Sequence, residues 1–145
     1  MNLAIRAYED ADEAQVVALW REVFPDAPAR NEPRLAIRLK RGVQPELFLV
    51  AVAERRVVGT AMGGFDGHRG WLHLLAVDPR LRGQGIGAAL VRRLEAALDA
   101  AGCPKLNLQV RGDNRGVVGF YERLGYRVED RVSLGKLLPS APQGE

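Results

Sequence analysis

A glycine-rich loop between an apolar run and a long helical pattern constrains this chain most. The apolar run from Trp71 to Val77 ends before Pro79, because proline lacks the amide that a strand or a helix would use. The loop follows, and its glycines are Gly83, Gly85 and Gly87. Apolar residues then recur at helical spacing over residues 86–101. The unit predicts a strand, a turn, a glycine loop and a helix, in that order.

The start of the predicted helix has no side chain that could cap it. Residues 82–86 include no Ser, Thr, Asp or Asn, so the first backbone N–H groups of the helix lack an internal acceptor. The glycines allow a tight turn and a close approach of a ligand, and Arg82 adds a positive charge. These features favour a phosphate site over the simpler alternative, a turn that only joins strand to helix.

The residues around the glycines narrow the choice of phosphate ligand. No Gly-Lys-Ser or Gly-Lys-Thr follows, so the loop is not a P-loop. The segment Gly83-x-Gly85-x-x-Ala88 does fit the loose dinucleotide pattern, with Asp113 as the candidate ribose ligand. That alternative is weaker, since residues 78–81 separate the glycines from the strand and too little chain remains for a doubly wound domain.

Two stretches resemble the N-acetyltransferases of the GNAT family. VDPRLRGQGIG is similar to the family's acetyl-CoA-binding signature, with Arg82-x-x-Gly85-x-Gly87 as its core. LNLQVRGDNRGVVGFYERLGYRV is similar to the family's second half: a strand, an Asn, a short helix with Phe-Tyr and a closing Leu-Gly-Tyr. The two motifs stand in the family's order and spacing. The chain most resembles small bacterial members, including those that acetylate the N-termini of ribosomal proteins.

The resemblance implies an α/β (α+β) fold, with a single GNAT-type domain over residues 1–138. Its sheet would be mixed and mostly antiparallel, with six to seven strands, about four flanking helices and splayed central strands. Residues 139–145 are small, polar and proline-containing, and we expect a disordered C-terminal tail there.

The hydrophobic patterns outside the glycine unit supply the other elements. Strands are expected at residues 3–7, 47–53, 57–64, 105–111, 126–129 and 132–137, and helices at 9–24, 34–41 and 114–124. In the central strand, simple alternation places Trp71, His73, Leu75 and Val77 on one face. Gly63-Gly64 indicates a bulge or a close backbone approach.

By the resemblance, acetyl-CoA enters the gap between the splayed strands, with its pyrophosphate on the glycine loop. The loop residues expected to hold it are Arg82, Gly83, Gln84, Gly85, Ile86, Gly87 and Ala88. The backbone of Leu75, Ala76 and Val77 would bind the pantetheine arm as an added strand would, and an N–H there would stabilise the thioester oxyanion. Asn114, a predicted helix N-cap, often contacts the cofactor in this family.

Tyr121 fits either a core position or the family's general acid. Composition alone favours the core, but the motif FYERLG at residues 120–125 favours the acid, which would protonate the departing thiolate. The general base is open. Gln109 stands where the ribosomal-protein acetyltransferases have a glutamate, and glutamine accepts no proton. His73 and water are the remaining candidates, although His73 equally fits a buried core histidine.

Composition excludes other classes of function. The net charge of +3 is small and arginine is scattered, so we expect no nucleic-acid partner. The single cysteine, Cys103, forms no disulfide within the chain and suits a reducing cytoplasm. No apolar run is long enough to span a membrane, and we expect no signal peptide.

We therefore predict a cytoplasmic N-acetyltransferase. It would transfer the acetyl group of acetyl-CoA directly to a primary amine, on a small molecule or a protein N-terminus or lysine, in a ternary complex. No metal is needed, and a homodimer is compatible with the sequence. Two alternatives stay open: a non-catalytic acyl-CoA-binding sensor with the same fold and, less favoured, a dinucleotide-binding protein.

Overall fold

A five-stranded sheet forms the centre of the molecule in the computed structural model, which describes residues 1–142. The strands lie in chain order across the sheet: β1 (Leu3–Ala7), β2 (Phe48–Ala53), β3 (Arg56–Phe65), β4 (Gly70–Val77) and β5 (Leu106–Leu108). The first four pair antiparallel, and β5 runs parallel to β4. The α/β class and the mixed, mostly antiparallel sheet are confirmed.

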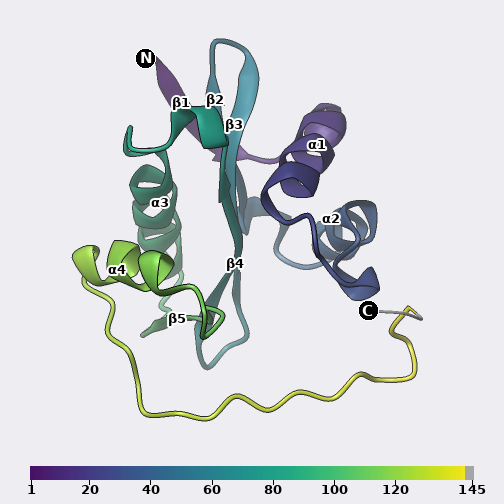
Figure 1. Ribbon diagram of the computed structural model, residues 1–145, viewed down its shortest axis with the longest axis vertical. Coiled ribbons are helices and arrows are strands. Elements are labelled where there is room, and N and C mark those ends of the chain that lie inside the picture. Colours follow the sequence, from purple (N-terminus) through teal and green to yellow (C-terminus); the bar gives the residue numbers. More distant parts are fainter. Residues whose placement is uncertain (143–145) are drawn as a thin grey trace.

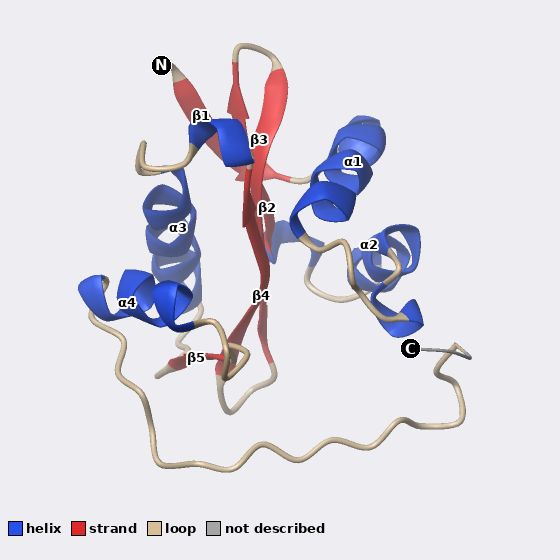
Figure 2. Cartoon of the chain, in the orientation of Figure 1, coloured by secondary structure: helices blue, strands red, loops and turns tan. Residues whose placement is uncertain are grey.

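Within residues 1–142, four α-helices cover the two faces of the sheet (Figures 1 and 2). α1 (Glu13–Val23) and α2 (Pro33–Arg41) lie on one face, and α3 (Ile86–Ala100) and α4 (Arg115–Arg123) on the other. The helix expected from residue 9 begins later, because residues 10–12 form a 3-10 turn instead. The number of flanking helices is as predicted.

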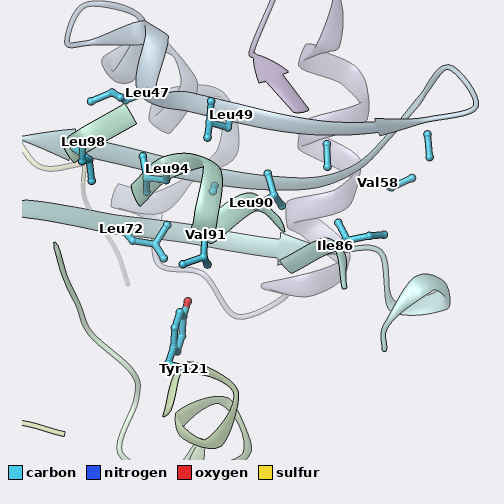
Figure 3. Packing of buried hydrophobic residues seen from close by; sticks show 13 residues of the cluster. Leu47, Leu49, Val58, Leu72, Ile86, Leu90, Val91, Leu94, Leu98 and Tyr121 are labelled. Atoms are coloured by element: carbon cyan, nitrogen blue, oxygen red, sulfur yellow. The ribbon is translucent and has the colours of Figure 1, made fainter. Parts of the chain in front are cut away.

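Each face of the sheet has its own hydrophobic core. On the α3 face, Leu90 and Leu94 are fully buried and pack with Leu49 and Leu72 of the sheet (Figure 3). On the α1 face, the core is built around Trp20 and Phe48, whose rings stack with centroids 5.7 Å apart. Fully burying one large apolar side chain contributes about 2 kcal/mol. Each core contains several such side chains, so both helix layers are held firmly to the sheet.

The glycine pair in β3 lies where α3 comes close to the sheet. A Cβ atom at Gly63 would clash with the side chain of Leu94. Of the two readings of Gly63-Gly64, the close backbone approach is therefore the one observed at Gly63.

The two strands expected at residues 126–129 and 132–137 are absent, so the prediction of six to seven strands was wrong for the described chain. After α4 the chain runs as an extended loop past β5, where Glu129 accepts from Lys105 and Ser133 accepts from Gln109, and then continues towards α2 (Figure 1). Val132 and Leu134 are 84% and 89% exposed. Alternating residues of this kind favour a strand when one face of that strand packs against other residues. Among the described residues, Val132 and Leu134 have no such packing. The strand expected at 105–111 is also shorter, because only residues 106–108 pair with β4.

The predicted C-terminal tail is described only in part. Near its start the chain turns, with the Ala141 N–H donating to the Leu138 carbonyl at 2.9 Å. Residues 143–145 lie outside the described residues. Within residues 1–142, no helix combines the length and the apolar character that crossing a membrane would require.

Candidate active site

β4 and β5 pair at only one end, which opens a gap in the sheet. Their register runs from Gly70 opposite Leu106 to Leu72 opposite Leu108. β4 continues to Val77, and within residues 1–142 no strand pairs with it there on the β5 side. The backbone groups on that side of β4 are free to meet an extended ligand.

A bulge in β4 decides which backbone groups face this gap. Gly70 donates its N–H to Lys105 on the β5 side, while Asp78 donates to Val58 on the β3 side, each at 2.8 Å. In a regular strand, residues an even number of positions apart donate their N–H groups to the same side. Gly70 and Asp78 are an even number of positions apart but donate to opposite sides, so β4 contains one extra residue between them. The β3–β4 register shifts at this place, and Leu74 has a φ of +52°.

The bulge corrects the face assignment made from simple alternation. Leu75 and Val77 pack in the α3-side core, whereas Leu74 belongs to the α1-side core. The expectation that His73 shares a face with Leu75 and Val77 was therefore wrong. Its cause is the extra residue, which inverts the alternation after His73.

The bulge also decides the direction of the N–H groups at the three backbone positions predicted to bind the pantetheine arm. Ala76 lies opposite Thr60, so its N–H and carbonyl face β3. By the same alternation, counted back from Asp78, Leu75 and Val77 direct their N–H groups towards the gap. Two of the three predicted positions thus have their N–H groups on the open side.

The start of α3 is uncapped, as the sequence predicts. Gly85 occupies the N-cap position with a φ of +82°, and no side chain caps the helix. Gly83 has a φ of +81°, and at both glycines a Cβ would meet nothing within 4 Å. These two glycines therefore permit the left-handed backbone conformation, and the space that a side chain would fill stays open at both positions. The nearby Asp78 side chain is used elsewhere, since it accepts from the Arg80 N–H at 3.0 Å.

The remaining residues of the loop differ in what they can offer a ligand. Ile86 is 1% exposed, so only its backbone can take part. Gly87 lies where a Cβ would come 3.2 Å from Phe120 and 3.6 Å from Val77. This proximity of Gly87 to Val77 places the open helix start beside the open end of β4. Arg82, Gln84 and Ala88 are at least partly accessible to solvent.

Tyr121 lies in α4 and is 7% exposed. Its ring packs edge-on against Phe120 and Tyr126, with centroids 5.0 and 5.6 Å away. In Figure 3 its hydroxyl points from α4 towards the core beneath the sheet. Burial raises the pKa of Tyr121 to about 12, because the ionised phenolate would lose its hydration. The phenol therefore keeps its proton at physiological pH.

Asn114 takes the N-cap position of α4, as predicted, but its side chain makes no capping hydrogen bond. The predicted capping role is thus only positional. The side chain is exposed, and its amide is free to contact a ligand.

His73, the side-chain candidate for the general base, and Gln109, which stands at the position of the family's glutamate, have different surroundings. His73 is exposed, but partial desolvation and the charge of Lys40 lower the pKa of its imidazole. Its neutral form can therefore accept a proton at physiological pH. Lys40 itself is buried and donates from Nζ to the Gly63 carbonyl at 2.5 Å. Gln109 instead donates from Nε2 to Ser133 Oγ at 2.6 Å.

A wide cleft of about 2070 Å³ lies beside β5 and α4. Tyr121 and Trp71 line it, as do three polar residues of the segment expected as a strand at 105–111, namely Asn107, Gln109 and Arg111. The structure thus brings these residues to one cleft. The glycine loop and His73 do not line it.

Sequence reasoning missed a buried polar bridge behind β4. The indole Nε1 of Trp20 donates to Thr60 Oγ1 at 2.8 Å, and Thr60 Oγ1 donates to the Leu74 carbonyl at 2.9 Å. The only signal in the sequence was a lone hydroxyl within an apolar strand. No group of three or more His, Cys, Asp or Glu side chains suited to a metal is found within residues 1–142.

The comparisons with known proteins agree with this geometry. The model of the acetyltransferase (GNAT) family matches residues 11–126. An acetyltransferase of Yersinia enterocolitica is 46% identical over 136 residues, which cover 94% of this chain and 96% of the relative. An acetyltransferase of Sodalis glossinidius is 47% identical over 137 residues, with the same two coverages.

Solved structures share the fold. Ard1 from Thermoplasma volcanium has a TM-score of 0.80 and 25% identity, covering 89% of this chain and 85% of that one. An aminoglycoside N-acetyltransferase in complex with CoA has a TM-score of 0.77 at 16% identity, covering 94% and 95%.

Proposed function

Since the chain belongs to the GNAT family of acetyltransferases, and is an acyltransferase, we propose that it transfers acetyl from acetyl-CoA directly to a primary amine in a ternary complex. One observation carries the proposal most. The uncapped start of α3 lies beside the end of β4 that faces the gap, with Gly87 against Val77. A ligand with a pyrophosphate and an extended amide-bearing arm is complementary to that pair of features.

The donor half of the site consists mainly of backbone groups. The N–H groups of residues 85–88 bind the pyrophosphate, and the Arg82 guanidinium adds charge. The N–H groups of Leu75 and Val77 bind the arm in the gap. Asn114 contributes its free side-chain amide. A related fold that binds CoA, the aminoglycoside N-acetyltransferase, supports this ligand.

The chain's own groups supply the chemistry at the thioester that bound acetyl-CoA presents. An N–H of β4 donates to the carbonyl oxygen as negative charge develops on it. Tyr121 gives its proton to the leaving sulfur, and its raised pKa keeps that proton available. His73, or water, takes the proton that the attacking amine loses.

The decisive experiment has two stages. Thermal unfolding is measured with acetyl-CoA, CoA, NAD and no ligand, and a native-state ligand at a hundredfold excess over Kd adds about 2.7 kcal/mol of stability. We expect the unfolding midpoint to rise with acetyl-CoA and with CoA, and not to change with NAD. A rise with NAD alone would return Gly83-x-Gly85-x-x-Ala88 to the dinucleotide alternative.

The second stage separates an enzyme from a sensor. Thiol release from acetyl-CoA is followed over a panel of primary amines that includes small molecules, peptide N-termini and lysine peptides. Release with at least one amine supports the proposal, whereas binding without release over the whole panel supports the sensor. The domain limits 1–138, the cytoplasmic location and the homodimer stay predictions of the sequence.

A further inference from the structure

We propose that Thr60 is a positioning residue for acetyl-CoA: bridged to Trp20, it holds the bulge of β4 and thereby keeps the N–H groups of Leu75 and Val77 turned into the gap. The inference rests on the proposed function only in assigning those N–H groups to acetyl-CoA. The bulge and its bridge are features of the fold itself.

The bulge needs support because it is strained. Leu74 has a φ of +52°, the left-handed region that glycine favours, and leucine is not glycine. Such a backbone is energetically unfavourable for a non-glycine residue. A regular strand would avoid that cost, so other contacts must hold the extra residue in place.

Thr60 supplies the holding contact. Its Oγ1 donates to the Leu74 carbonyl at 2.9 Å and accepts from Trp20 Nε1 at 2.8 Å. Thr60 is 0% exposed and Trp20 is 2% exposed. Buried hydrogen bonds of this kind are costly to lose, since both partners would be left unsatisfied without water. The hydroxyl thus fixes the Leu74 carbonyl in the orientation that the bulge requires.

The consequence reaches the donor site through the alternation of the strand. Without the extra residue, the N–H groups of Leu75 and Val77 would turn towards β3, and that of Ala76 would enter the gap. Thr60 lies on β3 opposite Ala76, so it acts through the backbone of β4. It is therefore a positioning residue and not a catalytic one.

The bridge also links the donor site to the far face of the sheet. Trp20 lies in α1, and its ring stacks on Phe48, which stacks on Tyr8 with centroids 4.6 Å apart. The aromatic packing restricts the indole, so its N–H is held towards Thr60. The α1 layer thereby helps to set the backbone that faces the gap.

Thr60→Val tests the inference, because valine keeps the shape and removes the hydroxyl. We expect its KM for acetyl-CoA to rise about tenfold and its CoA-induced rise in unfolding midpoint to shrink, with KM for the amine unchanged. Thr60→Ser restores the hydroxyl and most of the affinity. Trp20→Phe removes one of the two bonds and gives an intermediate loss, about threefold.

Val16→Ala is the matched control, since Val16 is fully buried in the same layer and has no polar group. It should lower stability while leaving KM for acetyl-CoA unchanged. Equal KM changes in Thr60→Val and Val16→Ala would overturn the inference, as would a serine variant no better than valine. If Thr60→Val does not fold, the Ser and Phe variants decide by the same comparison with Val16→Ala.

Backbone NMR of the unliganded protein separates this inference from the proposed function. The Leu74 φ, read from its amide coupling constant, should leave the left-handed region in Thr60→Val and return to it in Thr60→Ser. An unchanged φ in the valine variant refutes the bridge even if acetyl-CoA binds. A changed φ in a protein whose wild type binds no acetyl-CoA refutes the proposed function and leaves the bridge standing.

Discussion

Helices α2 and α3 begin in opposite ways. At α2 the Glu32 carboxylate accepts from the Leu35 N–H at 2.9 Å, and Pro33 takes the first helical position, where an N–H would have no partner. At α3 a left-handed glycine stands at the N-cap and no side chain caps the helix. The chain closes one helix start with its own atoms and leaves the other open, beside a gap in the sheet. Open backbone groups in that setting indicate a ligand site.

The largest effect on acetyl-CoA binding is expected from placing a carboxylate at the N-cap of α3, as Glu32 provides at the N-cap of α2. Gly85→Asp would place a negative charge where the proposed pyrophosphate lies, in addition to backbone strain at φ +82°. We expect acetyl-CoA affinity to fall by at least about a hundredfold, roughly 2.7 kcal/mol of binding free energy. Isothermal titration or the acetyl-CoA-dependent rise in unfolding midpoint measures it.

Gly67→Asp is the matched control for that variant. Gly67 has a φ of +92° and, like Gly85, open space around its missing Cβ, but it lies in the turn between β3 and β4. The same strain and charge there should leave acetyl-CoA affinity unchanged. If both aspartates weaken binding alike, strain and not the open helix start explains the loss.

A second, smaller effect distinguishes two neighbouring tyrosines on the α3 side of the sheet. Tyr121→Phe should lower kcat about 100-fold, the lower limit of the usual contribution of general-acid catalysis, with KM for acetyl-CoA unchanged. Tyr126 donates its hydroxyl to Glu95 Oε2 at 2.6 Å, so Tyr126→Phe should cost about 1 kcal/mol of stability and leave kcat intact. Steady-state kinetics and urea unfolding of both variants decide. An unaltered kcat in Tyr121→Phe would assign Tyr121 to the core alone.

The pH dependence of kcat follows from two pKa shifts. Tyr121 must hold its proton to act as an acid, and burial raises its pKa to about 12, so kcat should not fall as pH rises through 10. The pKa of His73 is lowered, so a base at this position stays neutral until the pH falls below the ordinary imidazole pKa of about 6.5. The acid limb of the profile should therefore lie below that value and disappear in His73→Gln. An alkaline limb centred near pH 10 would contradict the role of Tyr121.

The sequence predicted the parts of the site that depend on local backbone. The uncapped start of α3 was readable because capping side chains are simply missing from residues 82–86. The strand and helix periodicities likewise placed β1 to β4 and the four helices. Local patterns suffice where a residue's role is settled by its neighbours in the chain.

Long-range packing accounts for what the sequence did not reveal. The bulge at Leu74 has no glycine or proline to mark it, and it is held by Trp20 and Thr60, which lie 40 residues apart. Conversely, Val132 and Leu134 alternate like strand residues but belong to no strand in the structure, and both are exposed. Both outcomes depend on which segments meet in three dimensions, and alternation in one segment carries no record of that.

The smallest expected effect tests the closed helix start. Glu32→Ala removes the cap of α2 and should cost about 0.5 kcal/mol of stability at pH 7, the low end for a cap, because the Glu32 side chain is 43% exposed. The N–H groups of Leu35 and Arg34 lower the pKa of Glu32 in the folded state. Its contribution is therefore present above the unfolded pKa of about 4.3 and is lost as the pH falls through the folded value.

Urea unfolding of wild type and Glu32→Ala at pH 7 and at pH 3 measures this, and the difference between the two proteins should shrink at pH 3. The KM for acetyl-CoA should be the same in both, since the closed helix start lies on the opposite face of the sheet from α3. A raised KM in Glu32→Ala would mean that α2 also shapes the donor site. The contrast between the two helix starts would then no longer separate stability from binding.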